Sequence, residues 1–191
     1  MKTILRNHLW AFLLGSAICP TTQASDIIEV LPLTDRIIMV HFDDGKVIHH
    51  KLGENRNSDV LKSSPLDVSR AGTATCYTIT STDDTNYAEA RNPSDVGRKS
   101  KGTDFTMSSI WTPDWQSKSW AQEHWIYLFL PSGMQHGKNY TLDTGTLATG
   151  KNSFSFVFNE SELRSEAIHV NQVGYLPDAR KKVWIRLSLD G

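Results

Sequence analysis

Four of the six tryptophans fall within one stretch of fifteen residues, and these side chains are the best suited to bind a ligand. They are Trp111, Trp115, Trp120 and Trp125, and Gln116 lies among them. An aromatic ring exposed on a loop can stack on the apolar face of a pyranose, and polar neighbours can hydrogen-bond the sugar hydroxyls. The stretch therefore predicts a carbohydrate site, with Trp115 and Trp120 as the exposed pair and Trp111 and Gln116 beside them.

The alternative interpretation of the same tryptophans is packing, since large aromatic side chains more often fill a core than form a platform. In that case Trp125 belongs to a core strand, and Trp111 with one other ring covers the edge of a β-sandwich. The sequence leaves both interpretations open.

Other groups capable of chemistry lie in predicted turns and loops. We interpret the acidic pairs Asp43–Asp44, Asp83–Asp84 and Glu160/Glu162 as solvated turn carboxylates, so no catalytic residue is predicted. His41 faces His49 or His50 if the strands around them pair, but a metal ion needs a third and usually a fourth ligand. We therefore predict no metal site, and no phosphate loop, HExxH or CxxC motif indicates a cofactor.

The first 24 residues have the features of a secretory signal peptide. Lys2 and Arg6 form a basic start, the apolar segment 9–19 follows, and Thr22 and Ala24 place small residues at a cleavage site. The apolar segment is shorter than the roughly 20 residues of a spanning helix. Cleavage after Ala24 is favoured over a lipid anchor on Cys19, and either predicts an exported chain in the periplasm, at the cell surface or outside the cell.

The net charge and the cysteine count limit the partners that the chain can be expected to bind and the covalent bonds that can stabilise it. The whole chain has a net charge of −1, and removal of the leader with its two basic residues leaves −3. A nucleic-acid partner would call for a strong basic excess, so none is predicted. Cys76 is the one cysteine beyond the leader, which excludes an intramolecular disulfide, and its strand-like surroundings predict a buried, inert thiol.

Residues 25–165 show the pattern of an all-β domain. Apolar, β-branched segments at 36–42 and 46–52 flank Asp43-Asp44-Gly45, which predicts a β-hairpin. Further strands are expected at 73–80, 124–130, 139–144 and 152–158, whereas the polar segments 53–72 and 81–104 are expected to be long loops. Many short strands separated by turns predict an antiparallel, immunoglobulin-like β-sandwich.

Residues 166–191 are expected to begin a second unit. Apolar segments near 167–175 and 182–189 predict two strands, and about 25 residues are too few to bury a sandwich core. The second unit is therefore interpreted as the incomplete start of a further immunoglobulin-like domain.

The start of this second unit resembles a known family. Residues 168–182 are similar to the opening of the immunoglobulin-like domain that precedes the catalytic module in family 9 glycoside hydrolases, where a V-N-Q-x-G-Y-x-P pattern recurs. Asn171, Gln172, Gly174, Tyr175 and Pro177 match that pattern in order. Their roles are structural: Gly174 can adopt a positive φ at a bend, and Pro177 fixes the next turn.

The resemblance implies a scaffold beside a catalytic barrel that lies further along the same parent chain. It also implies that the catalytic acids are not in these 191 residues. We therefore expect a non-catalytic accessory region of a secreted carbohydrate-degrading enzyme, with polysaccharide and the downstream catalytic domain as partners. A cell-surface adhesion or protein-interaction module is the alternative, and an inert spacer is a third possibility that predicts no exposed aromatic pair.

Overall fold

The computed structural model describes residues 25–51, 53, 59–107 and 118–164, together with two short strands further along the chain. The predicted leader lies outside the described residues. So do Trp111, Trp115, Gln116 and the five residues of the family 9 motif.

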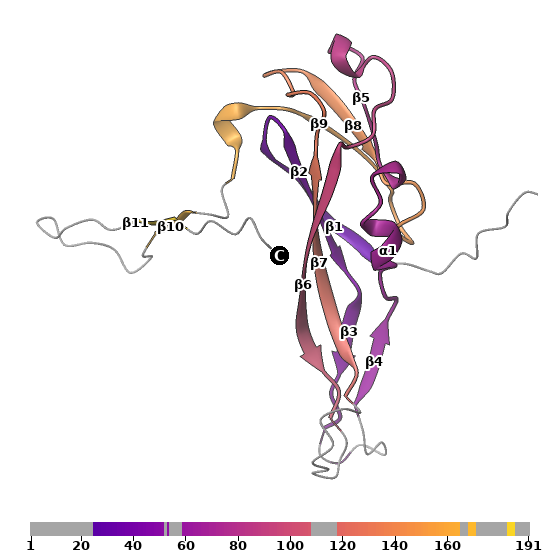
Figure 1. Cartoon of the computed structure of the whole chain (residues 1–191). Helices are drawn as coiled ribbons and strands as arrows, with labels where there is room; N and C mark the ends of the chain where they lie inside the picture. The colour runs from indigo at the N-terminus through magenta and orange to yellow at the C-terminus, as the bar shows by residue number, and fades with distance from the viewer. Residues whose placement is uncertain are drawn as a thin grey trace, which may run out of the picture.

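A four-stranded antiparallel sheet runs along the length of the molecule (Figure 1). Its strands are β1 (Asp26–Thr34), β2 (Ile37–Asp43), β7 (Trp120–Phe129) and β6 (Asp95–Phe105), in the spatial order β1-β2-β7-β6. On β7, buried Ile126 and Leu128 alternate with half-buried neighbours, as expected of a strand with one face toward the core.

A three-stranded antiparallel sheet packs near one end of the four-stranded sheet, at the top of Figure 1. It contains β5 (Thr78–Thr80), β8 (Asn139–Asp143) and β9 (Ser153–Val157), in the order β5-β8-β9. A two-stranded ribbon of β3 (Gly45–Ile48) and β4 (Val60–Ser63) lies toward the other end.

Short helical turns connect these sheets. They are α1 (Val68–Ala71), η1 (Ala74–Cys76), η2 (Thr85–Tyr87) and η4 (Glu160–Glu162). Asp67 caps α1, because its carboxylate accepts hydrogen bonds from the amides of Ser69 and Arg70. None of the helices among the described residues has the length and apolar character to cross a membrane.

The core lies between the long sheet and the three-stranded sheet. Ile38, Val40 and Phe42 of β2 enter it from one side, and Tyr140 and Leu142 of β8 enter it from the other. Cys76 lies partly buried against this core as a free thiol, in agreement with the predicted packing role. The predicted all-β antiparallel sandwich is confirmed.

The predicted hairpin at Asp43-Asp44-Gly45 is wrong. β2 pairs with β1 and β7, while β3 pairs with β4, so the chain leaves one sheet for another at this point. Gly45 has a φ of 126°, and a Cβ there would lie 2.2 Å from the carbonyl oxygen of Lys62. Glycine adopts a positive φ readily, and a chain that passes from one sheet to another can require this as much as a hairpin turn does. The Asp-Gly sequence therefore does not distinguish the two.

The two polar segments predicted as loops also contain regular structure. Residues 53–72 include β4 and α1, and residues 81–104 include most of β6. Along β6, Arg98, Lys99 and Lys101 are exposed. β6 stands at the end of its sheet, where a strand needs no continuous apolar pattern.

Further along the chain, β10 (Ile168–Val170) pairs antiparallel with β11 (Val183–Ile185). Both strands fall within segments where the sequence predicts them. The motif residues between them lie outside the described residues.

Candidate functional site

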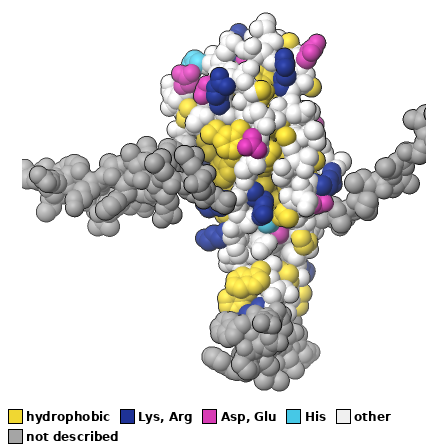
Figure 2. Space-filling view, in the orientation of Figure 1, with side chains coloured by type: hydrophobic (Ala, Val, Ile, Leu, Met, Phe, Trp, Pro, Cys, Tyr) yellow, Lys and Arg dark blue, Asp and Glu magenta, His cyan; other side chains and the backbone are white. Residues whose placement is uncertain are grey.

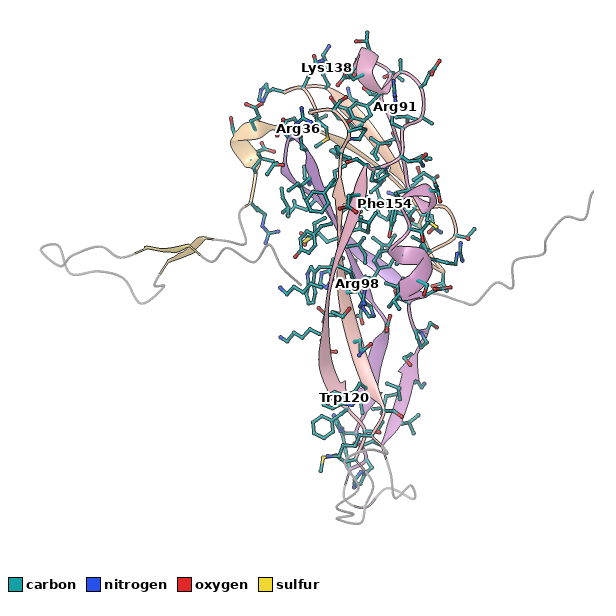
Figure 3. All side chains as sticks on the ribbon, in the orientation of Figure 1. Arg36, Arg91, Arg98, Trp120, Lys138 and Phe154 are labelled. Atoms are coloured by element: carbon teal, nitrogen blue, oxygen red, sulfur yellow. The ribbon has the colours of Figure 1, made fainter. Side chains whose placement is uncertain are left out.

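Trp120 is the one member of the predicted carbohydrate site that falls among the described residues, and its side chain is open to solvent. It begins β7 and is 50% exposed. Its ring lies 5.1 Å from that of Phe105, its partner on β6. Figure 3 shows Trp120 at the lower end of the long sheet.

A glycine allows the ring to lie close to the neighbouring strand. A Cβ added to Gly102 would come within 2.9 Å of the Trp120 ring, so a larger residue there would displace it. The register of β6 against β7 also shifts between Gly102 and Asp104, as in a β-bulge. Bulges re-aim side chains at strand ends, and here the bulge directly precedes the residue that packs against Trp120.

Further side chains suited to ligand contact surround this ring pair. Met107, two residues beyond Phe105, is 46% exposed. The Lys118 ammonium lies 4.5 Å from the centroid of the Phe105 ring, within cation–π range. Figure 2 shows hydrophobic side chains gathered at this lower end. We call the group of Phe105, Met107, Lys118 and Trp120 the tip.

A buried carboxylate joins the tip to the β3–β4 ribbon. The side chain of Asp59, which precedes β4, is only 2% exposed. It accepts hydrogen bonds from the amide of His50 at 2.9 Å, the amide of Met107 at 2.8 Å and both neighbouring imidazoles. Burial alone would raise the pKa of Asp59, but these hydrogen bonds outweigh it and hold the pKa well below its usual value.

His49 bridges two carboxylates. Its Nδ1 lies 2.8 Å from an oxygen of Asp59, and its Nε2 lies 2.8 Å from an oxygen of Asp104 on β6. A carboxylate only accepts, so an imidazole bonded to two of them donates from both nitrogens and is positively charged. The hydrogen bonds to Asp104 and then to Asp59 accordingly raise the pKa of His49.

This histidine–aspartate cluster has the composition of a metal site but a different arrangement. No group of three or more histidine, cysteine, aspartate or glutamate side chains among the described residues is placed to hold a metal ion. The nitrogens that would ligate a metal are directed at carboxylates instead. The cluster therefore acts as a clamp that fixes β3 and β4 to the end of β6.

The other histidine of the predicted hairpin lies elsewhere. His41 does not face His49 or His50; it lies opposite Trp125 on β7 and stacks on its ring at 4.4 Å. On the other side of that ring, the Lys99 ammonium lies 4.9 Å from the centroid. Trp125 thus belongs to a central strand, as the packing interpretation predicts, but its ring stands on the face opposite Ile126 and is covered by His41 and Lys99.

Two aspartates interpreted from sequence as solvated turn carboxylates are buried, which corrects that interpretation. Asp44 is 6% exposed and accepts from the Leu66 amide at 2.9 Å. Asp84 is 2% exposed and accepts from the Tyr140 hydroxyl at 2.6 Å. In each Asp-Asp pair the second residue turns inward, which the polar sequence around it does not indicate.

A comparison of this chain with known proteins gives no match to a family model, to a curated protein or to a solved structure. The likeness of residues 168–182 to family 9 glycoside hydrolases therefore stays a prediction.

Proposed function

We propose that this chain is the non-catalytic N-terminal accessory region of a secreted, family 9-like glycoside hydrolase, and that it binds polysaccharide at the tip. The observation that carries the proposal is the half-exposed Trp120 ring, braced by Phe105 and seated against Gly102. An indole held in a fixed orientation with an open face suits stacking on a pyranose, because little side-chain entropy is lost on binding.

Polar groups at the same end of the long sheet supply the second requirement of a sugar site. Asp104 directly precedes Phe105 and is 38% exposed at its side chain, and its partner His49 is 50% exposed. A carboxylate and an imidazolium at the same end of the sheet as the aromatic rings can accept from and donate to the hydroxyls of a sugar chain. Trp111, Trp115 and Gln116, which the sequence assigns to the carbohydrate site together with Trp120, lie outside the described residues.

The accessory role rests on sequence features. The predicted leader supports export, and the motif at residues 171–177 supports a position ahead of a family 9-type immunoglobulin-like domain. The downstream catalytic domain would then be the covalent partner, and the tip would hold the enzyme near its polymeric substrate.

The test is retention of the chain, without residues 1–24, on a panel of insoluble and soluble polysaccharides. We expect retention on at least one glycan, and we expect Trp120→Ala to weaken it by about tenfold or more, since stacking and burial of one ring contribute about 1–3 kcal/mol. Trp125→Ala is the matched control, because that ring lies on the sheet between His41 and Lys99.

Retention by the parent chain that Trp125→Ala keeps and Trp120→Ala loses supports the proposal. A folded chain that binds no glycan in the panel contradicts it. Equal loss in both variants also contradicts it, because a site at the tip predicts a difference between them.

The second candidate is a protein-interaction module, and one observation favours it. Trp125, Tyr127 and Phe129 of β7 stand half-buried on the face of the long sheet opposite the core, and Figure 2 shows hydrophobic side chains gathered on the visible surface of the domain. A protein partner on this face would make Trp125→Ala, rather than Trp120→Ala, the variant that abolishes binding.

A further inference from the structure

We propose that Ser100, His124 and Asp44 form a nucleophilic site in which the Ser100 hydroxyl takes an acyl group from a small carboxylic ester. This proposal is independent of glycan binding at the tip. It concerns a different part of the long sheet: Figure 3 labels Arg98, a neighbour of this site, at mid-height and Trp120 at the lower end.

The three side chains form a continuous hydrogen-bonded line. Ser100 Oγ lies 2.7 Å from His124 Nδ1, and His124 Nε2 lies 3.1 Å from Asp44 Oδ2. Ser100 and His124 are direct partners in the β6–β7 ladder, so the backbone register sets their alignment. Asp44 reaches the imidazole from the crossover between β2 and β3.

The direction of each hydrogen bond follows from its neighbours. Asp44 accepts from the Leu66 amide with one oxygen and from His124 with the other. In the neutral ring, a proton on Nε2 leaves the lone pair on Nδ1, which then accepts from the Ser100 hydroxyl. Arg98 donates from Nη1 to Ser100 Oγ, and this directs the hydroxyl hydrogen toward the imidazole.

This polarity is that of a serine activated by a general base. A hydroxyl is a weak nucleophile until a base can remove its proton, and an imidazole backed by a carboxylate is suited to that task. The Arg98 guanidinium supplies positive charge beside the atom that becomes negative as the proton leaves. In serine proteases Nε2 faces the serine and Nδ1 faces the aspartate, whereas here Nδ1 faces Ser100 and Nε2 faces Asp44. The order of donors and acceptors from serine to aspartate is the same.

Exposure also favours chemistry at this serine. His124 is 1% exposed and Asp44 is 6% exposed, whereas Ser100 and Arg98 are exposed on the strand at the end of the sheet. An ester can therefore approach the serine oxygen while the base and the acid stay within the protein. The open edge leaves room for a small acyl group.

The acyl transfer uses only the groups of this site and the ester. Ser100 Oγ attacks the carbonyl carbon of the ester while its proton passes to His124 Nδ1, and Asp44 stabilises the charged imidazole. The bond between the carbonyl carbon and the leaving oxygen then breaks, and the proton on His124 passes to that oxygen. The products are an acyl-Ser100 ester and the free alcohol, with no oxidant or cofactor required.

The experiment uses p-nitrophenyl acetate as the ester and the chain without residues 1–24. We expect a burst of p-nitrophenol that approaches one equivalent, with the acetyl group mapped to Ser100 by peptide mass spectrometry. Ser155 is the internal comparison, because it is an exposed serine whose hydroxyl pairs with the Thr141 hydroxyl at 2.9 Å rather than with an imidazole. General-base assistance predicts acetylation of Ser100 roughly 100-fold or more faster than of Ser155.

Three exposed positions provide variants that keep the buried His124–Asp44 pair intact. Ser100→Ala should abolish the burst, and Ser155→Ala should leave it unchanged. Arg98→Ala should slow the burst by about tenfold or more, since one electrostatic donor is removed. Acetylation of Ser100 no faster than of Ser155, or a burst that persists in folded Ser100→Ala protein, would overturn the proposal.

Discussion

Different interactions stabilise the two ends of the long sheet. At the end covered by the three-stranded sheet, side chains such as Tyr77, Leu142 and Phe158 are fully buried in one core. At the tip, the β3–β4 ribbon is joined to β6 by the His49–Asp59–Asp104 clamp beside a half-exposed tryptophan. The end covered by the three-stranded sheet, which we call the body, therefore depends on hydrophobic burial, whereas the tip depends on charged hydrogen bonds that respond to pH.

Tyrosines in the body show how the core accommodates polar groups. The Tyr77 hydroxyl donates to the Ala71 carbonyl at 2.6 Å, and the Tyr140 hydroxyl donates to buried Asp84. Burial raises the pKa of both tyrosines, and the Asp84 carboxylate raises that of Tyr140 further. Both phenols therefore stay neutral donors at any physiological pH, so these two hydrogen bonds do not change over the pH range in which the clamp is expected to respond.

The largest expected effect is in the body. Phe158→Ala removes a fully buried ring from the core, and we expect a loss of about 3–5 kcal/mol in the free energy of unfolding. Urea denaturation followed by tryptophan fluorescence measures it. Val157→Ala is the control, because Val157 is 54% exposed and should change stability by roughly 0.5 kcal/mol or less. Equal losses in the two variants would contradict the assigned core.

A smaller but substantial loss is expected where the body meets the ribbon. Gly45→Ala adds a methyl group at a φ of 126° and 2.2 Å from the Lys62 carbonyl oxygen. Backbone strain of this kind costs about 1–3 kcal/mol, and the contact with Lys62 adds to it. Gly137→Ala is a strained control without a clash, since its φ is also positive but no atom lies within 4 Å of the added Cβ. The melting temperature should fall further for Gly45→Ala than for Gly137→Ala.

The third expected effect is confined to the tip. Asp59→Asn removes the charge that attracts the two imidazoles and exchanges one accepting oxygen for a donor, which should cost on the order of 1–3 kcal/mol locally. Hydrogen exchange should accelerate at the amides of His50 and Met107, which donate to Asp59, and stay unchanged at Leu142 in the core. Acceleration at Leu142 as well would show that the tip and the body unfold as one unit.

The smallest expected effect is a pH response of the clamp. The pKa of His49 is raised above 6.5. The contribution of His49 to the stability of the clamp is therefore complete below pH 6.5 and is lost as the pH rises through the raised pKa. The pKa of Asp59 is lowered from 3.8, so its contribution is present above 3.8 and is lost as the pH falls through the lowered pKa. The clamp should therefore be strongest between about pH 4 and 6.5.

Titration of the His49 ring by NMR measures this response directly. We expect a midpoint above 6.5 in the parent chain, and a lower midpoint after Asp104→Asn, because the hydrogen bond to Asp104 is the largest cause of the shift. An unchanged midpoint in Asp104→Asn protein would contradict the bridging role of His49.

The sequence predicts the fold class well but the strand pairing poorly. The apolar segment 124–130 indicates β7, and alternation at 152–158 indicates β9, because side chains that face the interior wholly or in part leave a clear apolar pattern. β6 leaves none, since it lies at the edge of a sheet and carries lysine, arginine and glycine. The Asp-Gly step at residues 44–45 satisfies the rule for a hairpin, but β2 already has β1 and β7 as neighbours.

The candidate sites show the same division. The clustering of the tryptophans is visible in the sequence and indicates Trp120 as a candidate ligand-binding residue. Its ring is half-exposed in the structure. The clamp joins residues up to 55 positions apart, and the Ser100–His124–Asp44 line joins residues up to 80 apart. The Ser100–His124 pair depends on the register of β6 against β7, and the clamp depends on where the β3–β4 ribbon meets β6. No local sequence pattern records either arrangement.

The charges along β6 have a consequence for the protein in solution. A strand at the end of a sheet offers its unpaired backbone to any other extended chain, and long, flat, apolar edges of this kind lead to aggregation. Arg98, Lys99 and Lys101 place like charges along this edge, so a second copy in the same orientation would meet repulsion before a backbone ladder could form. The charged residues that make β6 hard to recognise as a strand in the sequence thus also oppose association of one molecule with another at high concentration.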